Sequence, residues 1–431
     1  MKEVSISRSE HPILKFFRKI PLAWVVVIAY VFISVCATAQ CILGHLKSYG
    51  RSEKIYTNYN NYVIFKNSFF HLIQGKNLYV FYLNEQWDLY KYSPSFSFLF
   101  GSFAYLPDFI GLFFWNLLNV APVLIGVKYL KGISNRNKYY TLLFCVIELL
   151  GNLQNSQSNG LMAGLIILTF ISLENEKYFF ASLFVVFSVY LKIYGGIAFV
   201  LFIFYPAKPK LFFYTLFWFI VIGLLPLISI SWNQLIYLYH RWGELVKTDQ
   251  ELSIGISVSG ILYTWFNWQV SRTMISLIGI ILFLLPLCRI QQFKYRAFRL
   301  SMLCSMLIWV VIFNHKAESP TYIIALLGVA IWYFSQPKTV VNFALLILTL
   351  LLTTFSVSDL TPRFIRNGFV NPYGIKAVMP IVVWCKIMVE LYFKNYGKVG
   401  KKYPGLSTPM ASGLVSQLQK TGQGRMGDTL L

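Results

Sequence analysis

The chain has 431 residues, of which 57% are hydrophobic and only 13% charged. Soluble domains carry about a quarter charged residues, so the composition excludes a soluble globule and predicts an integral membrane protein. The formal net charge of +22 does not indicate a nucleic-acid partner, because the basic residues cluster beside apolar segments rather than along one face. The six cysteines fall within apolar segments without a metal-ligand spacing, so we expect neither disulfides nor a metal site.

The hydropathy pattern predicts an all-α, polytopic transmembrane helical protein with about twelve spans. The expected spans are residues 22–43, 109–127, 139–151, 160–173, 178–191, 194–205, 211–231, 273–288, 298–313, 320–335, 339–356 and 375–393. Several are shorter than the roughly 20 residues that cross a bilayer, most clearly the two between residues 178 and 205. Short helices are tolerated where a cavity or neighbouring protein covers their ends, so we expect a deep crevice beside these two.

The Lys and Arg residues of the loops indicate the orientation. With twelve spans the basic loops all fall on one side, which the positive-inside rule makes cytoplasmic. Both termini then lie in the cytoplasm, and the protein belongs to the inner or plasma membrane. Residues 1–402 form the predicted membrane domain, and residues 403–431 a disordered cytoplasmic tail rich in Gly, Ser, Gln and Thr. The long loops 44–108 and 232–272 lie outside, so we expect the chemistry on that face.

An amphipathic helix is predicted in the first outer loop. Phe65, Phe69 and Leu72 recur at helical spacing, and Gly75 ends the pattern. Such a helix lies on the outer bilayer surface, either as a packing element or as the floor of a cleft for a lipid substrate.

The segment 85–94 follows, with two carboxylates, a lysine and several aromatic residues. A carboxylate can accept a proton from a hydroxyl group, Lys91 can neutralise a phosphate, and the ring of Tyr92 can stack on a sugar. The alternative is an interfacial aromatic belt with solvated charges.

Three further constellations fall on the outer side. The amide-rich segment 151–160, with Gln157 and Asn159, suits a polyhydroxylated ligand or is a polar turn. Lys192 stands alone between two short apolar helices, where a lysine snorkels or needs a partner such as phosphate. The segment 314–320 contains His315, Lys316 and Glu318, which form an ion-pair turn, bind phosphate or move a proton.

Through these residues the chain resembles glycosyltransferase family 87, membrane mannosyltransferases of the C-type superfamily. Members typically start the first outer helix with Asp-Phe, followed by a Gly fourteen residues after the Asp and then a Tyr; here Asn61, Gly75 and Tyr79 stand there. A Tyr-Pro-Pro motif opens a later apolar run that closes with Leu-Pro. Here Tyr92-Ser93-Pro94 opens the run, and Leu106-Pro107 closes it.

The remaining motifs match in part. Of a Gly-Gln-x-Asn motif, Gln157 and Asn159 are present and Ser156 replaces the Gly; of a Lys-Pro pair, Lys192-Ile193 is present. The resemblance covers about residues 60 to 205, and the C-terminal half is similar only in hydropathy.

The resemblance implies a C-type fold and inverting transfer of a hexose, expected to be mannose. The donor would be a polyprenyl-phosphate sugar and the acceptor a glycan or glycolipid hydroxyl on the outer face. Membrane lipid is the other expected partner, and neither a cofactor nor a metal is expected. The residues expected to bind substrate are Asn60, Asn61, Tyr79, Lys91, Tyr92, Gln157, Asn159, Lys192, His315 and Lys316.

The identity of the catalytic base is left open, because Asn61 replaces the family's aspartate and an amide has no usable basicity. Asp88 is the first candidate, Glu318 and Glu85 are the others, and a chain without a base would be a non-catalytic relative that binds lipid-linked glycan. A twelve-span transporter is the alternative from another class, which predicts ionisable residues in mid-span and symmetry between halves. The sequence has few such residues, with Glu148, Lys386 and Glu390 near span ends, and no symmetry. An outer-face glycan polymerase or ligase is a third possibility.

Overall fold

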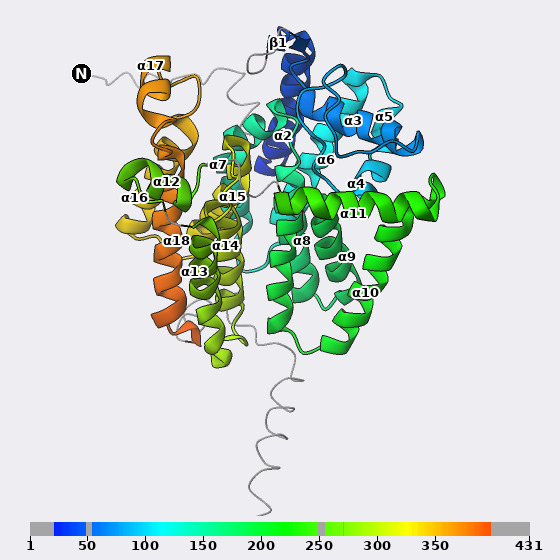
Figure 1. Ribbon diagram of the computed structural model, residues 1–431. Coiled ribbons are helices and arrows are strands. Elements are labelled where there is room, and N and C mark those ends of the chain that lie inside the picture. The colour runs from blue at the N-terminus through cyan, green and yellow to red at the C-terminus, as the bar shows by residue number, and fades with distance from the viewer. Residues whose placement is uncertain (1–20, 49–53, 249–254, 270, 398–431) are drawn as a thin grey trace, which may run out of the picture.

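The computed structural model describes residues 21–48, 54–248, 255–269 and 271–397. Most of these residues are helical, and most long helices run between two ends of a bundle that α11 crosses (Figure 1). A short antiparallel pair, β1 (Lys47–Ser48) and β2 (Ile55–Tyr56), precedes the helix α3. The all-α class predicted from the hydropathy pattern is confirmed.

The described helices divide in chain order into two halves. The first half contains α2 (Leu22–Leu43), α3 (Asn60–Ile73), α4 (Pro94–Leu99), α5 (Gly101–Ala104), α6 (Asp108–Tyr129), α7 (Asn135–Gln154), α8 (Asn159–Glu174), α9 (Tyr178–Leu191) and the 3₁₀-helix η1 (Ile193–Phe204). The second half contains α10 (Lys208–Leu224), η2 (Leu225–Ile228), α11 (Trp232–Thr248), α12 (Val258–Phe266), α13 (Arg272–Leu284), η3 (Leu285–Cys288), η4 (Ile290–Gln292), α14 (Arg296–Ile312), η5 (Ser319–Thr321), α15 (Tyr322–Phe334), α16 (Val340–Thr349), η6 (Leu350–Phe355), α17 (Arg363–Ile365), η7 (Arg366–Val370) and α18 (Ile375–Phe393).

The described chain begins and ends at the same end of the bundle. Asn137, in the first turn of α7, donates a hydrogen bond to Phe334 O at the end of α15, and Lys394, after α18, donates to Gln336 Oε1. Since α2 runs parallel to α7, it too starts here. We call this the basic end, because the helix ends and loops that meet there carry Lys128, Lys131, Lys138, Lys177, Lys208, Arg296 and Lys394. The opposite end, with α3 and α11, is called the site end.

A buried ion-pair network joins three elements at the basic end. Glu174 accepts two hydrogen bonds from Arg299, at 2.6 and 3.1 Å, and one from Arg296 at 2.8 Å. Tyr205, directly after η1, donates to the same carboxylate at 2.6 Å. The side chains of Glu174 and Arg299 are only 3% and 2% exposed. The network therefore fixes α8, η1 and α14 together where the loops are short.

Within the part of the chain that the structure describes, three helices are long and apolar enough to cross a membrane: Leu22–Leu43, Asp108–Tyr129 and Lys208–Ile228. The shorter apolar helices are Asn159–Glu174, Tyr178–Leu191, Ile193–Phe204, Arg272–Cys288, Ser319–Phe334 and Val340–Phe355. Large apolar side chains also cover the outside of the bundle; Trp24 and Phe32 on α2 are 61% and 63% exposed. Such a surface suits lipid rather than water. The count of about twelve spans stays a prediction.

The short segment Ile193–Phe204 covers a large distance because it forms a 3₁₀-helix, η1, which rises about 2.0 Å per residue. Its buried residues are Gly195, Ala198, Leu201 and Phe204, which recur every three residues as a 3₁₀-helix requires. Their size increases away from the site end, and a Cβ on Gly195 would lie 2.6 Å from Ser188 O of α9. The helix is therefore closest to α9 beside Lys192, the residue that joins the two.

Candidate functional site

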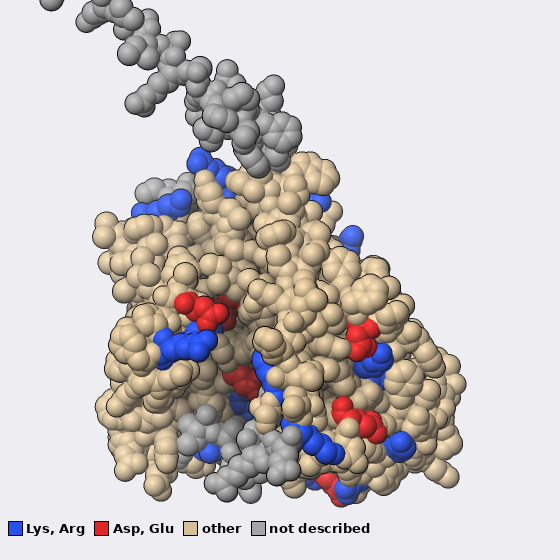
Figure 2. Space-filling view, turned by 90° about the horizontal axis from the view of Figure 1, so that it is seen from above, with Lys and Arg blue, Asp and Glu red and all other residues tan. Residues whose placement is uncertain are grey.

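A cavity of about 320 Å³ opens at the site end. Seen from this end, acidic and basic side chains lie together around a hollow near the middle of the face (Figure 2). Residues far apart in the sequence line the cavity: Asn61, Ile64, Phe65, Asp88, Leu89, Lys91, Tyr92, Gln157, Lys192, Ile193, Tyr194, Trp242, Val246, Asn314, His315, Lys316, Glu318 and Thr321. The outer constellations expected from the sequence thus meet in one place, next to the two short helices.

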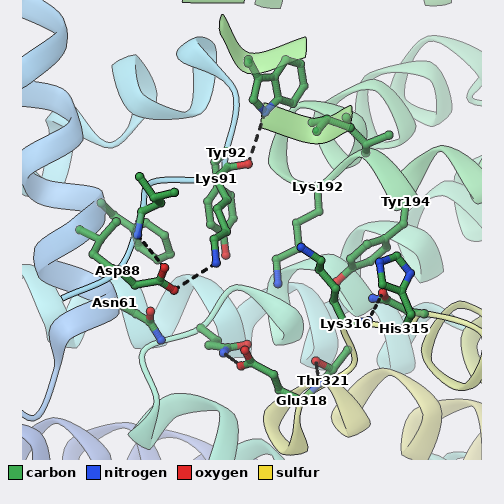
Figure 3. Close-up of a pocket in the computed structure, with 18 residues that line it drawn as sticks. Asn61, Asp88, Lys91, Tyr92, Lys192, Tyr194, His315, Lys316, Glu318 and Thr321 are labelled. Atoms are coloured by element: carbon green, nitrogen blue, oxygen red, sulfur yellow. Dashed lines mark hydrogen bonds and ion pairs between the residues drawn. The ribbon is translucent and has the colours of Figure 1, made fainter. Parts of the chain in front are cut away.

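Asp88 and Lys91 form one wall of the cavity (Figure 3). Lys91 Nζ lies 3.1 Å from Asp88 Oδ2, and the amide of Leu89 donates to Asp88 Oδ1 at 2.7 Å. Asp88 has a φ of 78°, a left-handed conformation that side chains other than glycine adopt at an energetic cost. Its carboxylate is 47% exposed. The backbone turn therefore presents an accessible carboxylate to the cavity.

An amide chain connects Lys192 to Glu318. Lys192 Nζ donates to Asn159 Oδ1 at 2.8 Å, Asn159 Nδ2 donates to Gln157 Oε1 at 2.7 Å, and Gln157 Nε2 donates to Glu318 Oε2 at 2.6 Å. Gln157 lies in the loop 155–158 between α7 and α8, here called the amide loop, and Asn159 is the first residue of α8. The chain fixes the ammonium and the carboxylate at two places in the same cavity.

Lys192 lies between α9 and η1, with its ammonium near two aromatic rings. Nζ is 5.7 Å from the ring centre of Tyr92 and 5.8 Å from that of Tyr194. Burial lowers the pKa of Lys192 to about 8, against the opposing effect of Glu318. Among the described residues, no carboxylate lies within ion-pair distance of Nζ. A partly buried cation without a counter-ion is unfavourable, so the position favours an anionic ligand.

The loop 314–318 forms the opposite wall and carries His315, Lys316 and Glu318 into the cavity (Figure 3). Ile256 N donates to Ala317 O at 2.8 Å, and a Cβ on Gly255 would lie 2.3 Å from His315 O. The segment before α12 therefore packs directly against this wall, which couples the segments around residues 256 and 316.

Four residues expected at the site lie beside the cavity rather than on its lining. Asn60 holds the backbone of Trp87, and Tyr79 Oη donates to Tyr92 O at 3.0 Å. Glu85 Oε2 lies 2.9 Å from His71 Nε2. Asn159 lies beneath the cavity in the amide chain. Asn61 does line the cavity, and its Nδ2 donates to Asn155 O at 2.8 Å, which links α3 to the amide loop.

Among the described residues, no group of three or more His, Cys, Asp and Glu side chains is placed to hold a metal ion. The charged lining instead combines lysines with carboxylates, and the lysines outnumber the carboxylates. Lysines neutralise phosphate as point charges, and aromatic rings beside carboxylates suit a sugar.

Comparison with protein families gives a match over much of the chain. The sequence pattern described as glycosyltransferase family 87 matches residues 90–313, slightly more than half of the chain. The chain belongs to glycosyltransferase family 87. No curated protein matches it.

Membership in glycosyltransferase family 87 identifies the protein as a membrane glycosyltransferase, with a sugar donor and an acceptor as substrates. The match extends past residue 205, where the resemblance seen in the motifs stops, and includes Lys91, Gln157, Asn159 and Lys192. Asn61 and Asp88 precede the matched range, and the loop 314–318 follows it. Both carboxylates of the cavity lining, Asp88 and Glu318, therefore lie outside the matched range.

The motifs missed two aromatic residues that line the cavity. Trp242 reaches it from α11 and donates from Nε1 to Lys91 O at 3.3 Å. Tyr194, the second residue of η1, follows Lys192 by two positions. The amphipathic pattern of Trp232–Thr248 in the second outer loop was a signal for Trp242. The apolar run around Tyr194 gave no such signal, because the direction of the Tyr194 side chain depends on the 3₁₀ geometry of η1.

Proposed function

We propose that the cavity transfers a hexose, expected to be mannose, from a polyprenyl-phosphate donor to a hydroxyl of a glycan or glycolipid. The observation that supports this proposal most strongly is the environment of the Lys192 ammonium. Two aromatic rings and an amide surround it, and no carboxylate of the described residues pairs with it. A single phosphate is the counter-ion that such a lipid donor brings. Lys91 and Lys316 surround the same space and add positive charge, and His315 also lines it.

In this mechanism Asp88 accepts the proton of the acceptor hydroxyl. The hydroxyl oxygen attacks C1 of the hexose from the side opposite the phosphate, and the bond between C1 and the phosphate oxygen breaks. The configuration at C1 inverts, the lipid phosphate leaves with the bonding electrons, and Lys192 neutralises its added charge. No metal takes part, because lysines supply the positive charge, and no cofactor takes part beyond the lipid-linked donor.

The local contacts favour Asp88 over the other carboxylates. Glu85 is outside the cavity lining and pairs with His71. Glu318 lines the cavity, but its carboxylate accepts a hydrogen bond from Gln157 and belongs to the chain that holds Lys192. Asp88 is accessible, and its strained backbone is the kind of feature that proteins retain at functional sites. Glu318 accordingly positions the amides that face the donor.

The orientation proposed for this chemistry places the site end outside the membrane. The lysine-rich loops lie at the basic end, which the positive-inside rule assigns to the cytoplasm. The described chain begins and ends there, so both termini are proposed to be cytoplasmic, at the cell membrane. The donor lipid then enters from the outer leaflet.

Binding of polyprenyl phosphate to the protein in nanodiscs tests the proposal. The variant Lys192→Met should weaken binding about tenfold or more, because a charged hydrogen bond to phosphate is lost. The control is Lys66→Met, which removes a lysine paired with Asp108 at 2.6 Å outside the cavity. Unchanged binding and transfer by Lys192→Met would contradict the proposal. Lipid binding by the unmodified protein without transfer, together with transfer by Asn61→Asp, would identify a non-catalytic relative instead.

A further inference from the structure

Three side chains of α3 hold the three residues that directly precede Asp88. Each of these side chains has a different partner residue in the loop. Asn60 bonds to both backbone groups of Trp87 at 2.6 and 2.9 Å, Asn67 Nδ2 donates to Gln86 Oε1 at 3.0 Å, and His71 Nε2 lies 2.9 Å from Glu85 Oε2. The loop therefore runs back along α3 in a fixed register and ends at Asp88. We call these four contacts the α3 clamp.

The spacing of the clamp residues places them on one helix face. Positions 60, 67 and 71 are seven and four residues apart, and at about 100° per residue they lie within about 40° of one another. Asn60 and His71 are 7% and 3% exposed, and Gln86 is 2% exposed. Buried polar groups with mutual partners are costly to separate. Asn67 is partly buried and the side chain of Glu85 is 42% exposed, so the clamp is buried at Asn60, His71 and Gln86 and reaches the surface at Glu85.

The clamp has an evident task at its end. Directly after Trp87 the backbone takes the left-handed conformation of Asp88, which an aspartate does not favour without support. The aromatic contact of His71 with Tyr82, whose ring centres are 3.9 Å apart, adds a second hold on the same loop. Lys66, on another face of α3, points to Asp108 and takes no part.

We propose that Asn60, Asn67 and His71 are positioning residues that fix the carboxylate of Asp88 at the reacting hydroxyl. Glu85 then serves as the anchor for His71. This inference rests on the proposed function, in which Asp88 is the base. Loss of one clamp contact moves the carboxylate without removing it, and a displacement of about 1 Å lowers turnover about 100-fold.

A double-mutant cycle tests the inference in the purified full-length protein in nanodiscs, with a polyprenyl-phosphate hexose as donor. Asn60→Leu should lower kcat about 10- to 100-fold and leave the KM for the donor unchanged, because the phosphate contacts remain. In the Asp88→Asn background, Asn60→Leu should cause no further loss of kcat, since its effect acts through Asp88. His71→Gln, which retains a donor for Glu85, should recover part of the turnover that His71→Leu loses. Lys66→Met is the control on the same helix, with unchanged kcat.

The outcomes separate the two proposals. Full turnover by Asp88→Asn would overturn the assignment of the base. If Asp88→Asn is impaired while Asn60→Leu keeps the parental kcat, the base stands and the clamp is refuted. Equal losses caused by Asn60→Leu with and without Asp88 would also refute it, as they indicate a general structural effect. Where Asp88→Asn is too slow to measure, the rate at which a maleimide labels Asp88→Cys replaces kcat. Asn60→Leu should change that rate, and an unchanged rate would refute the clamp.

Discussion

Gln157 Nε2 donates a hydrogen bond to Glu318 Oε2 at 2.6 Å, so the amide loop and the loop 314–318 meet across the cavity. The contact ends the amide chain that begins at Lys192. The negative charge of Glu318 acts through this arrangement and raises the pKa of Lys192, in opposition to burial. Two positions 126 residues apart in the sequence therefore control one property, the charge presented to the donor.

Donor binding should depend on pH through Lys192. Burial lowers its pKa to about 8, so the empty site is protonated below that pH and loses its charge above it. Because phosphate binds the protonated form, the KM for the donor should rise as the pH increases through about 8. Lys192→Arg should remove this dependence, since arginine stays protonated. A KM that is constant between pH 7 and 9 in the parent would contradict the assignment.

Replacement of Glu318 should shift the same profile. Glu318→Gln retains an amide oxygen for Gln157 but removes the charge that raises the pKa of Lys192. The rise in KM should therefore begin at a lower pH than in the parent. Steady-state kinetics at a series of pH values measures the shift. A move toward higher pH would show that Glu318 does not act on Lys192 electrostatically.

Removal of the proposed base should affect turnover and not donor binding. Asp88→Asn should lower kcat about 10²- to 10⁴-fold, the usual contribution of general-base catalysis. Asp108→Asn is the matched control, because Asp108 also pairs with a lysine at the site end but does not line the cavity. Transfer rates at saturating donor give the comparison. Equal effects of the two substitutions on kcat would contradict the assignment of Asp88 as the base.

The orientation is testable with a pair of exposed lysines. Lys76 follows α3 at the site end, and Lys177 lies between α8 and α9 at the basic end. In a background without the exposed Cys288 and Cys385, a membrane-impermeant maleimide should label Lys76→Cys from outside the cell and Lys177→Cys only after lysis. The reverse pattern would place the site in the cytoplasm.

Stability should depend on the network at the basic end. Glu174→Leu leaves Arg296 and Arg299 without their carboxylate, and the loss of one member of a buried pair costs about 3–5 kcal/mol. The thermal midpoint in detergent should fall clearly. Asp359→Asn, which breaks the exposed pair with Arg366, should leave it nearly unchanged. Similar midpoints for both variants would argue against the network as a structural lock.

Much of this site was predictable because periodicity and charge act locally. The helical spacing of Phe65, Phe69 and Leu72 predicted α3, and the isolation of Lys192 between apolar segments predicted a cation beside a crevice. These inferences need only neighbouring residues. The convergence of segments around residues 90, 157, 192 and 316 followed from their assignment to one side of the membrane.

Periodicity and charge could not predict the direction of individual side chains. Asn60 and Asn61 are adjacent, yet one holds Trp87 and the other lines the cavity, because successive residues on a helix point about 100° apart. Glu85 and Asp88 both looked like possible bases, but only the packing of the loop on α3 separates the anchor from the accessible carboxylate. The 3₁₀ geometry of η1 likewise arises from its fit against α9, which an apolar sequence does not encode by itself.

The three-residue period of η1 also limits how its length can vary. Removal of one residue would turn the buried face by about 120° and bring Phe202 or Val200 to where Leu201 packs, whereas removal of three would keep the face and shorten the helix by about 6 Å. Related chains that retain this helix should therefore differ in length here by multiples of three residues. The series from Gly195 to Phe204 further requires that a shortened version lose residues from the end near Phe204, since only glycine allows the approach to Ser188.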